Sequence, residues 1–464
     1  MPRAVASWDA GPVVARVRAT AGSGGTEEAA RVLGAALRAD PQDRSARREL
    51  VLLLVASGRW EEALPWCDEP RAGAGADTGA DTGADTAVGA DAGTDDEEWL
   101  PEAITVALER RDFPLAEGCA LLFARLRWGS SDPAVRSVVP LSVPKLRHDI
   151  DQMLHLRHLG VLGAEYDPVV DAYRSVHDRL AADGPGAREP LDTDANRAIA
   201  PTYNRLLHVR DTPRVARALS GRWDPATVEE QYVANAPGVV TVDDFLSPEA
   251  LDELYRFCLE STVWFGNRYD HGRLGSLMQD GFVCPLLTQI AEELRAALPQ
   301  LIGDRYPLRQ IWGFKCGPDV PADVTTHADF AAVNVNFWIT PDAANADEHS
   351  GGLVVHDVDA PLSWGFDSYN GRQDLIRPFL RSRGARSITI PYRQNRAVIF
   401  NSDLFHASDA VRFRPGYENL RINVTMLYGD REEELHHPRL SGPATPGLRP
   451  AWRSAALART RARA

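Results

Sequence analysis

The hydrophobic pattern divides the chain into a helical half and a half rich in short strands. Up to about residue 230, apolar residues recur every three or four positions, as on the buried face of an amphipathic helix. From about residue 237 several runs alternate with a period of two, which is typical of half-buried strands. Helices followed by a run of strands predict an α+β fold in which helices buttress a β-sandwich or barrel.

The first 71 residues are predicted to form helical hairpins. Apolar positions between residues 26 and 67 have helical spacing, Asp40-Pro41 interrupts the first helix, and Gly58 separates the next pair. These turns resemble those of a tetratricopeptide unit. Because one such unit cannot bury its own apolar face, we expect further helices to stack on residues 1–71.

A low-complexity segment follows at residues 72–98. The tetrad Gly-Ala-Asp-Thr occurs three times in succession from Gly75 to Thr86, and the segment carries eight acids but no Lys or Arg. Small and acidic side chains cannot offset the entropy of ordering, so we predict a flexible acidic insert. An expanded linker is the simpler interpretation, and a functional acidic arm is the alternative.

Residues 99–230 return to helical spacing and are predicted to form a second helical region. An apolar stripe runs along residues 143–160, and the same helix carries His148, His155 and His158. The i, i+3 spacing of the last two would suit a metal ion, but no carboxylate or further His is placed to complete a ligand set. We interpret all three histidines as surface or packing residues.

The half that starts at residue 237 opens with a strand and two helices. Residues 239–242 have a strand pattern, and residues 247–249 combine a serine cap, a proline and a first-turn acid, which is a helix start. That helix is predicted to end at Leu259, a second helix spans 284–301, and short strands follow from Leu308.

Composition and charge argue against several classes of protein. The net charge is −14, and removing the eight acids of the insert leaves −14 − (−8) = −6, so nucleic-acid binding is not favoured. The five cysteines are scattered without a Cys-x-x-Cys pair, which argues against a disulfide scaffold or structural zinc. We find no signal-peptide pattern and no run near the ~20 apolar residues of a membrane span. We expect a cytoplasmic protein with no membrane or nucleic-acid partner, and a basic, disordered tail at 431–464.

The candidate chemistry lies at His327-Ala328-Asp329. In an extended segment, positions i and i+2 face the same side, so His327 and Asp329 can bind one ion together. A distant second His would complete the 2-His-1-carboxylate set of non-haem Fe(II) oxygenases. The motif is weak alone, because 12 His and acids at 65 of 464 positions give about 12 × 0.14 ≈ 1.7 chance occurrences of His-x-acid.

The order of the strand-like runs after this motif gives it weight. Residues 333–340 alternate as a strand, and Gly351-Gly352 forms a turn into the next strand. Residues 396–400 lead to His406, and Arg421 opens the last strand-like run.

In this order the residues resemble the prolyl-hydroxylase-like branch of the 2-oxoglutarate/Fe(II)-dependent oxygenases, over residues 237–430. That branch has His-x-Asp, a Gly-Gly turn, a second His, and an Arg or Lys on the last core strand. The resemblance implies a double-stranded β-helix core (jelly-roll or cupin-like) with buttressing helices, preceded here by the all-α, repeat-like region. It implies that His327, Asp329 and His406 bind Fe(II), with 2-oxoglutarate and O₂ as cosubstrates.

The resemblance also assigns contacts to 2-oxoglutarate. Arg421 would hold its far carboxylate, since a planar guanidinium suits bidentate pairing, and Thr425 would add a hydroxyl. Trp338 stands where relatives often have a Tyr that touches the cosubstrate, and an indole can donate only one hydrogen bond. Asn334 and Asn336 face the same side as Trp338 and are interpreted either as ligand contacts or as satisfied polar core groups.

Two departures from the family pattern leave alternatives open. Arg421 lies 15 residues after His406, where the family often has about nine or ten, so Arg412 and Arg414 are alternative anchors. Residues 357–388 lengthen the connection between two core strands and are either a lid or an outer structural flap.

Other polar residues near the motif are candidates for lining the site or reaching the substrate. His349 and His356 flank the Gly-Gly turn, and His356 is expected to line the site rather than bind iron. A polar loop before the core could reach the substrate, through Asn267, Arg268, Tyr269, Gln279 and Asp280.

The sequence is compatible with three functions. Hydroxylation of a peptide or protein side chain, or of an amino-acid-like substrate, is the first, and the N-terminal helices would then be a site for a protein partner. The second is a tailoring oxygenase that hydroxylates, desaturates or cyclises a small molecule. The third is a non-catalytic metal-binding or interaction protein. Asp329 argues against a halogenase, because halogenating relatives have Ala or Gly at that position.

Overall fold

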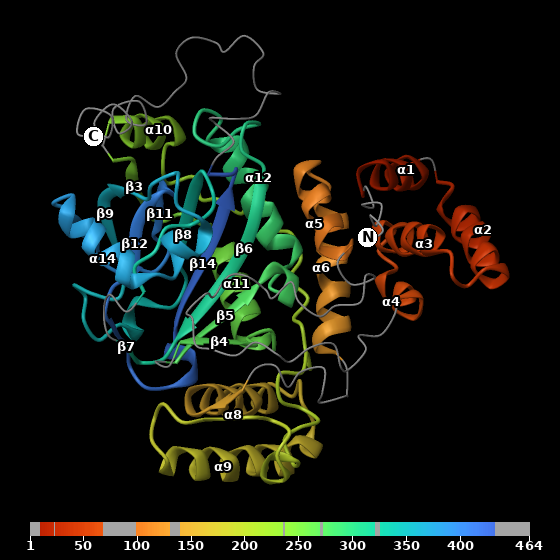
Figure 1. Cartoon of the computed structure of the whole chain (residues 1–464), viewed down its shortest axis with the longest axis horizontal. Helices are drawn as coiled ribbons and strands as arrows, with labels where there is room; N and C mark the ends of the chain where they lie inside the picture. The colour runs from red at the N-terminus through yellow and green to blue at the C-terminus, as the bar shows by residue number, and fades with distance from the viewer. Residues whose placement is uncertain are drawn as a thin grey trace, which may run out of the picture.

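We describe the chain from a computed structural model, shown in Figure 1. The structure describes residues 10–22, 24–67, 99–129, 140–234, 237–269, 272–320 and 325–431. The acidic segment predicted at 72–98 and the basic tail after residue 431 lie outside these residues.

Six helices lie N-terminal to residue 130 among the described residues, and Figure 1 shows them on one side of the molecule. The predicted break at Asp40-Pro41 is confirmed, because one helix ends at Ala39 and Asp43 caps the next by accepting a hydrogen bond from the Ala46 amide. The likeness to a tetratricopeptide unit stays a prediction. The helices are α1 (Ala10–Gly22), α2 (Thr26–Ala39), α3 (Arg44–Ala56), α4 (Trp60–Ala63), α5 (Trp99–Glu109) and α6 (Phe113–Trp128).

A second group of helices has its own core. Helices α8 (Val143–His158) and α9 (Asp167–Ala182) pack together at the bottom of Figure 1, with the short strands β1 (Leu141–Ser142) and β2 (Arg188–Glu189) beside them. Between α9 and α10 (Pro225–Ala234) the chain is mostly irregular, whereas the sequence pattern predicted helix there. Asn204, whose φ is 52°, has a backbone conformation in this stretch that a helix does not allow.

The strands form a large antiparallel sheet and smaller ones, which confirms the predicted α+β class. The seven-stranded sheet has the order β3-β11-β8-β14-β6-β5-β4, a three-stranded sheet has the order β10-β9-β12, and β13 pairs with β7. The strands of the large sheet are β3 (Val239–Val242), β4 (Gly266–Tyr269), β5 (Arg273–Leu277), β6 (Leu308–Cys316), β8 (Val333–Trp338), β11 (Ala397–Asn401) and β14 (Arg421–Tyr428). The others are β7 (Asp319–Val320), β9 (Leu353–Asp359), β10 (Ser387–Ile390), β12 (Leu404–Ser408) and β13 (Val411–Arg412).

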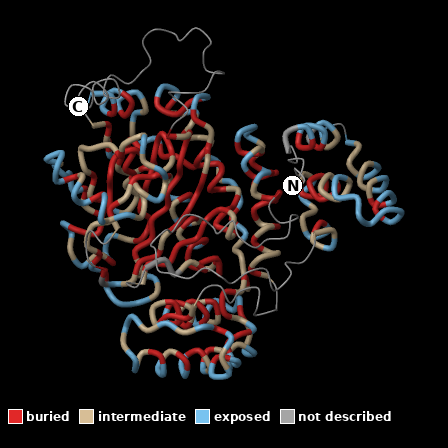
Figure 2. Tube along the Cα trace, in the orientation of Figure 1, coloured by how far each residue is buried: buried red, intermediate tan, exposed pale blue. Residues whose placement is uncertain are grey.

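The two faces of the large sheet have different neighbours. One face packs on α11 (Pro248–Glu260) and α12 (Pro285–Ala297) in a large apolar core. The buried residues of this region are coloured red in Figure 2. The opposite face meets the smaller sheet, since Val398 and Phe400 share a cluster with Leu353 and Leu404. The site lies on this inner face. Helix α12 ends at Ala297, four residues before the predicted end at 301, because Pro299 follows.

The segment 357–388 contains two helices that the sequence pattern did not predict. They are α13 (Phe366–Asn370) and α14 (Gln373–Ser382), and they pack through Tyr369 and Ile376 against Ala328 and Phe405. Part of the segment is thus folded onto the core beside the candidate metal ligands.

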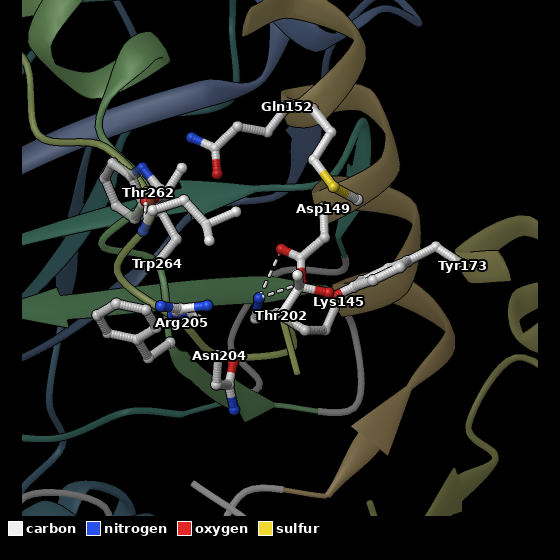
Figure 3. Close-up of a pocket in the computed structure, with 12 residues that line it drawn as sticks. Lys145, Asp149, Gln152, Tyr173, Thr202, Asn204, Arg205, Thr262 and Trp264 are labelled. Carbon is white, nitrogen blue, oxygen red and sulfur yellow. Dashed lines mark hydrogen bonds and ion pairs between the residues drawn. The ribbon is translucent and has the colours of Figure 1, made fainter. Parts of the chain in front are cut away.

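A small cavity lies between α8 and the chain around residues 202–207 and 262–265 (Figure 3). The Lys145–Asp149 ion pair borders it. None of the three candidate metal ligands lines this cavity. In the described part of the chain, no helix is long and apolar enough to span a membrane.

Candidate metal centre

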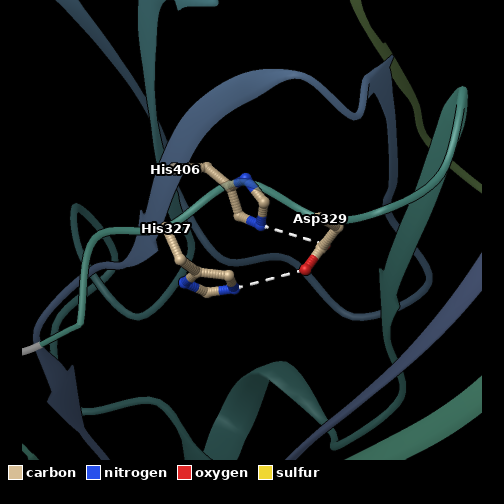
Figure 4. A group of neighbouring side chains, drawn as sticks. All are labelled: His327, Asp329 and His406. Carbon is tan, nitrogen blue, oxygen red and sulfur yellow. Dashed lines mark ion pairs between the residues drawn. The ribbon is translucent and has the colours of Figure 1, made fainter. Parts of the chain in front are cut away.

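His327 and Asp329 lie on one extended segment that pairs with the strand carrying His406. His327 and His406 form a two-way backbone bridge, with N–O distances of 2.9 and 2.7 Å. Because neighbouring side chains alternate along such a segment, His327 and Asp329 point to the inner face while Ala328 is buried on the other side. Figure 4 shows the three side chains directed at one another.

The geometry of the three side chains suits a single ion. His327 Nε2 lies 3.6 Å from Asp329 Oδ1, and His406 Nε2 lies 3.4 Å from Asp329 Oδ2. One ligand atom from each residue can be chosen so that all lie within 4.8 Å of one another. The three residues that the sequence suggested as metal ligands therefore lie together in the structure.

Hydrogen bonds orient each ligand. His327 Nδ1 donates to the Thr325 carbonyl at 2.7 Å, and His406 Nδ1 donates to the Leu404 carbonyl at 3.0 Å. A carbonyl can only accept, so both imidazoles carry their proton on Nδ1 and present an Nε2 lone pair to the centre. The Asn334 amide donates to Asp329 Oδ2 at 2.7 Å.

The electrostatics favour the protonation states that a metal needs. Burial, followed by the neighbouring His406, lowers the pKa of His327 to about 4, so this imidazole is neutral at pH 7. Burial opposes ionisation of Asp329, but His406, His327 and the Asn334 amide outweigh it and hold the carboxyl pKa below its usual value. Neutral imidazoles and an ionised carboxylate are the donor set of a non-haem Fe(II) site.

A row of polar groups continues inward from the ligands along β8 and β14. Asn336 lies opposite Thr425 in the register, and its amide nitrogen donates to the Thr425 hydroxyl at 3.0 Å. Three buried atoms of this row, Asn334 Oδ1, Asn336 Oδ1 and Trp338 Nε1, have no hydrogen-bond partner among the described residues. Since buried polar atoms are normally paired, these atoms fit a polar ligand that enters between the ligands and Arg421.

Arg421 is buried at the inner end of this row. Its Nε donates to the Gly351 carbonyl, its Nη2 donates to the Gly352 carbonyl at 3.2 Å, and its Nη1 donates to Asn423 Oδ1 at 2.9 Å. The guanidinium carbon lies 5.7 Å from the centre of the Trp338 ring. The Gly-Gly turn thus fixes the guanidinium.

The alternative anchors and the flanking histidines lie elsewhere. Arg412 and Arg414 are exposed, and so is His349. His356 is half-buried on β9, where it lies opposite Ser387.

Other polar residues singled out in the sequence have structural roles. The α8 residue His148 is buried beside Asp149, and its Nε2 lies 3.4 Å from Lys315 Nζ. Asp280 accepts a hydrogen bond from the Trp128 indole at 3.0 Å, and Gln279 accepts one from Gln310. The side chains of residues 267–269 lie outside the described part of the structure.

Arg273 is an inner-face residue that the sequence reasoning missed. It lies opposite Cys316, which in turn lies opposite Arg421, so the two arginines flank one position of β6. Its Nη1 donates to the Thr325 hydroxyl at 3.4 Å, beside His327. The alternation of Arg273, Gly275 and Leu277 was the available signal, but a five-residue strand with two small residues gives a weak pattern.

Aromatic residues border the same face near Asp329. The Trp312 ring centre lies 6.4 Å from that of Phe314 and 6.3 Å from that of Phe330. They share a cluster with Leu277 and Leu427.

No protein-family profile matches the sequence, and no curated protein matches it significantly. Among solved structures, the chain is similar to SnoK, a non-haem α-ketoglutarate-dependent carbocyclase from nogalamycin biosynthesis. That match has 12% identity over 46% of this chain and 87% of that one, with a TM-score of 0.31. A Pseudomonas putida prolyl-4-hydroxylase matches at 12% identity over 47% and 99%, with a TM-score of 0.26. EctD from S. alaskensis with bound Fe matches at 12% over 48% and 84%, with a TM-score of 0.31.

Proposed function

We propose that the chain is a 2-oxoglutarate-dependent non-haem Fe(II) oxygenase built on a double-stranded β-helix. The observation that carries this proposal is the convergence of His327, Asp329 and His406, with ligand atoms within 4.8 Å, at the head of a buried polar row that ends at Arg421. Three ligands leave open positions on the ion for a chelating cosubstrate and O₂.

The residues of the inner face fit the groups that the proposal requires. His327, Asp329 and His406 would hold Fe(II). Arg421 would hold the far carboxylate of 2-oxoglutarate, with the Trp338 indole N–H donating to it. When bound, iron and 2-oxoglutarate supply the oxidation of an unactivated C–H bond, with release of succinate and CO₂. The buried row excludes bulk water from the cosubstrate, which strengthens the pairing of its carboxylate with the guanidinium.

Thr425 and Asn336 have a positioning role in this proposal. The Asn336 amide nitrogen donates to the Thr425 hydroxyl, which leaves the amide oxygen to face 2-oxoglutarate. If the amide were turned over, the oxygen would accept from Thr425 and the nitrogen would face 2-oxoglutarate. Either orientation leaves one polar atom of Asn336 available.

The proposed substrate is a peptide or protein side chain, or an amino-acid-like molecule. Arg273 supports an acidic group in the substrate, because its guanidinium is buried beside the metal ligands on the inner face. In the peptide case the helices α1–α4 are the proposed surface for a protein partner.

A second candidate is a tailoring oxygenase for a small molecule. The cluster of Trp312, Phe314 and Phe330 beside Asp329 favours it, since aromatic walls suit a flat, apolar substrate.

The proposal is tested by 2-oxoglutarate turnover without a prime substrate. The protein, purified anaerobically and loaded with Fe(II), should convert 2-oxoglutarate to succinate slowly when O₂ is admitted. His327→Ala and Asp329→Ala should abolish the reaction, whereas His349→Ala, at an exposed His, should retain it. A wild type that neither binds 2-oxoglutarate in a metal-dependent way nor turns it over contradicts the proposal, and the non-catalytic alternative would then stand.

A further inference from the structure

The segment that carries His327 and Asp329 has two backbone edges, and only one pairs with the core strands. On that edge His327 exchanges two hydrogen bonds with His406, and the Asp329 amide donates to the Ser402 carbonyl at 3.1 Å. The backbone groups of Thr326 and Ala328 point the other way. If nothing paired with these groups, their burial without hydrogen bonds would cost free energy of folding.

The segment between β9 and β10 supplies partners for this second edge. The Ala328 amide donates to the Tyr369 carbonyl at 2.9 Å, and the Asn370 side-chain amide donates to the Ala328 carbonyl at 3.0 Å. The Gln373 side-chain amide donates to the Thr326 carbonyl at 2.6 Å. We call Tyr369, Asn370 and Gln373 the clamp.

The clamp is fixed to the core by apolar packing directly behind the metal ligands. Ala328 lies between His327 and Asp329, and Phe405 precedes His406, and both are fully buried in one cluster with α13 and α14. The Phe405 ring centre lies 6.3 Å from that of Trp364 and 6.1 Å from that of Phe379.

Arg431 ties the clamp to both ligand segments. Its guanidinium lies 4.1 Å from the centre of the Tyr369 ring, and its Nε donates to Asp403 at 2.6 Å, in the turn that leads to His406. Its backbone amide donates to the Phe330 carbonyl at 3.0 Å, one residue after Asp329.

From these contacts we propose that the clamp is a positioning element that sets metal affinity by holding His327 and Asp329 in register with His406. This rests on the proposed function only in so far as the three residues bind a metal ion. The segment 357–388 is then neither a mobile lid nor a passive flap. Residues that orient metal ligands through hydrogen bonds typically contribute about 10- to 100-fold in metal affinity.

The experiment exchanges donors for acceptors at nearly constant volume. Asn370→Asp and Gln373→Glu place a carboxylate against the Ala328 and Thr326 carbonyls, and Asn370→Ala and Gln373→Ala remove the side-chain amides. The added negative charge would by itself attract a cation, so weaker metal binding in the acidic variants reports the lost hydrogen bond.

Matched controls make the same exchange away from the metal ligands. Asn419→Asp alters an amide that donates to the Pro415 carbonyl at 2.8 Å, and Gln394→Glu alters one that donates to the Ile339 carbonyl at 3.2 Å. Co(II) affinity is measured by calorimetry and by the visible absorption of bound Co(II), alongside the unfolding temperature of each metal-free protein.

We expect the clamp variants to bind Co(II) about tenfold or more weakly, with altered Co(II) absorption, while the controls match the wild type. Clamp variants within twofold of the wild type, or controls that lose as much affinity, would overturn the proposal. A wild type that binds no Co(II) would instead overturn the metal centre itself and the clamp with it, so the two failures are distinguishable.

Discussion

At the residue scale, alternation along two strands decides which side chains meet. Asn334, Asn336 and Trp338 leave β8 on the same side as Arg421 and Thr425 leave β14, so a polar row forms without contact in sequence. The face of each residue in this row could be predicted from the sequence, because β8 and β14 each have a clear period of two. The candidate metal ligands could be named only from the order of His327, Asp329 and His406 along the chain, because the His-x-Asp motif alone is expected by chance.

The partners within the row could not be predicted from the sequence. Asn334 bonds to Asp329, and the Gly351 and Gly352 carbonyls bond to Arg421. These pairings depend on how a turn and a strand dock in space. Alternation gives the face of a residue but not its partner.

Substitution of Arg421 should change the affinity for 2-oxoglutarate. Arg421→Ala should weaken 2-oxoglutarate binding by about 10- to 100-fold, since a hydrogen bond to a charged group contributes about 1.5–3 kcal/mol. Arg421→Lys should retain part of the affinity through its charge. Calorimetric titration of the Co(II)-loaded protein with 2-oxoglutarate measures both.

The control for Arg421 is Arg412→Ala, at an exposed position of β13. It should bind 2-oxoglutarate as the wild type does. If Arg412→Ala loses affinity and Arg421→Ala does not, the anchor has been assigned to the wrong arginine.

At the element scale, long periodic runs were predictable and short insertions were not. Helix α11 and strand β3 lie where capping residues and alternation predicted them. Helices α13 and α14 were missed because α14 contains Pro378 and α13 has only five residues. Their place is set by packing on Ala328 and Phe405 rather than by local propensity.

Helix α8 carries a buried histidine, His148, that should make the stability of the protein depend on pH. Burial, followed by the charge of Lys315, lowers the pKa of His148 to about 3, despite the adjacent Asp149. The charged and titratable groups that face it are Lys145 and Asp149 from α8, Lys315 from β6, and the Tyr417 ring.

The sign of the effect follows from the lowered pKa of His148. Below its unfolded pKa of 6.5 the unfolded chain takes up a proton that the folded chain does not, so stability is lost as pH falls. Between pH 7 and pH 5 this contributes a loss of about 2 kcal/mol, at about 1.4 kcal/mol for each pH unit below 6.5. His148→Gln, which cannot titrate, should lose about that much less stability than the wild type over this range.

Urea unfolding at pH 7 and pH 5 measures the difference. His158→Gln, at an exposed position of the same helix, is the control and should keep the pH dependence of the wild type. An unchanged pH dependence in His148→Gln would mean that this His is protonated or solvated in the folded protein.

At the scale of the whole molecule, the N-terminal helices and the β-sheet share one apolar core. Residues of α1, α3 and α6 belong to the same cluster as those of α12 and β14. Polar contacts add to it, with Arg309 on β6 donating to Glu109 at 2.6 Å. The sequence pattern predicted the helices but not this continuity, because a hydrophobic stripe does not identify the surface that covers it.

A substitution at Gly118 of α6 tests how closely α6 packs on α3. A Cβ at position 118 would lie 2.4 Å from Val55 Cγ1, and the branched Val side chain has few ways to move aside. Gly118→Ala should lower the free energy of unfolding by about 1–3 kcal/mol through overpacking, against a helix-propensity gain of about 1 kcal/mol at most. Co(II) affinity should stay at the wild-type value, because the nearest atoms that the added methyl group would crowd belong to Val55 of α3.

The matched control is the same substitution at Gly34, in the middle of α2. There the nearest atom to an added Cβ is Arg38 Nη1 at 3.7 Å, so only the propensity gain of about 0.5–1 kcal/mol should appear. Denaturant unfolding of both variants separates crowding from propensity. If Gly118→Ala is as stable as Gly34→Ala, α3 does not pack closely on α6, and the helices before α5 are free to move relative to the β-sheet. If it is less stable while Co(II) binding is unchanged, those helices are an integral part of the core that supports the sheet.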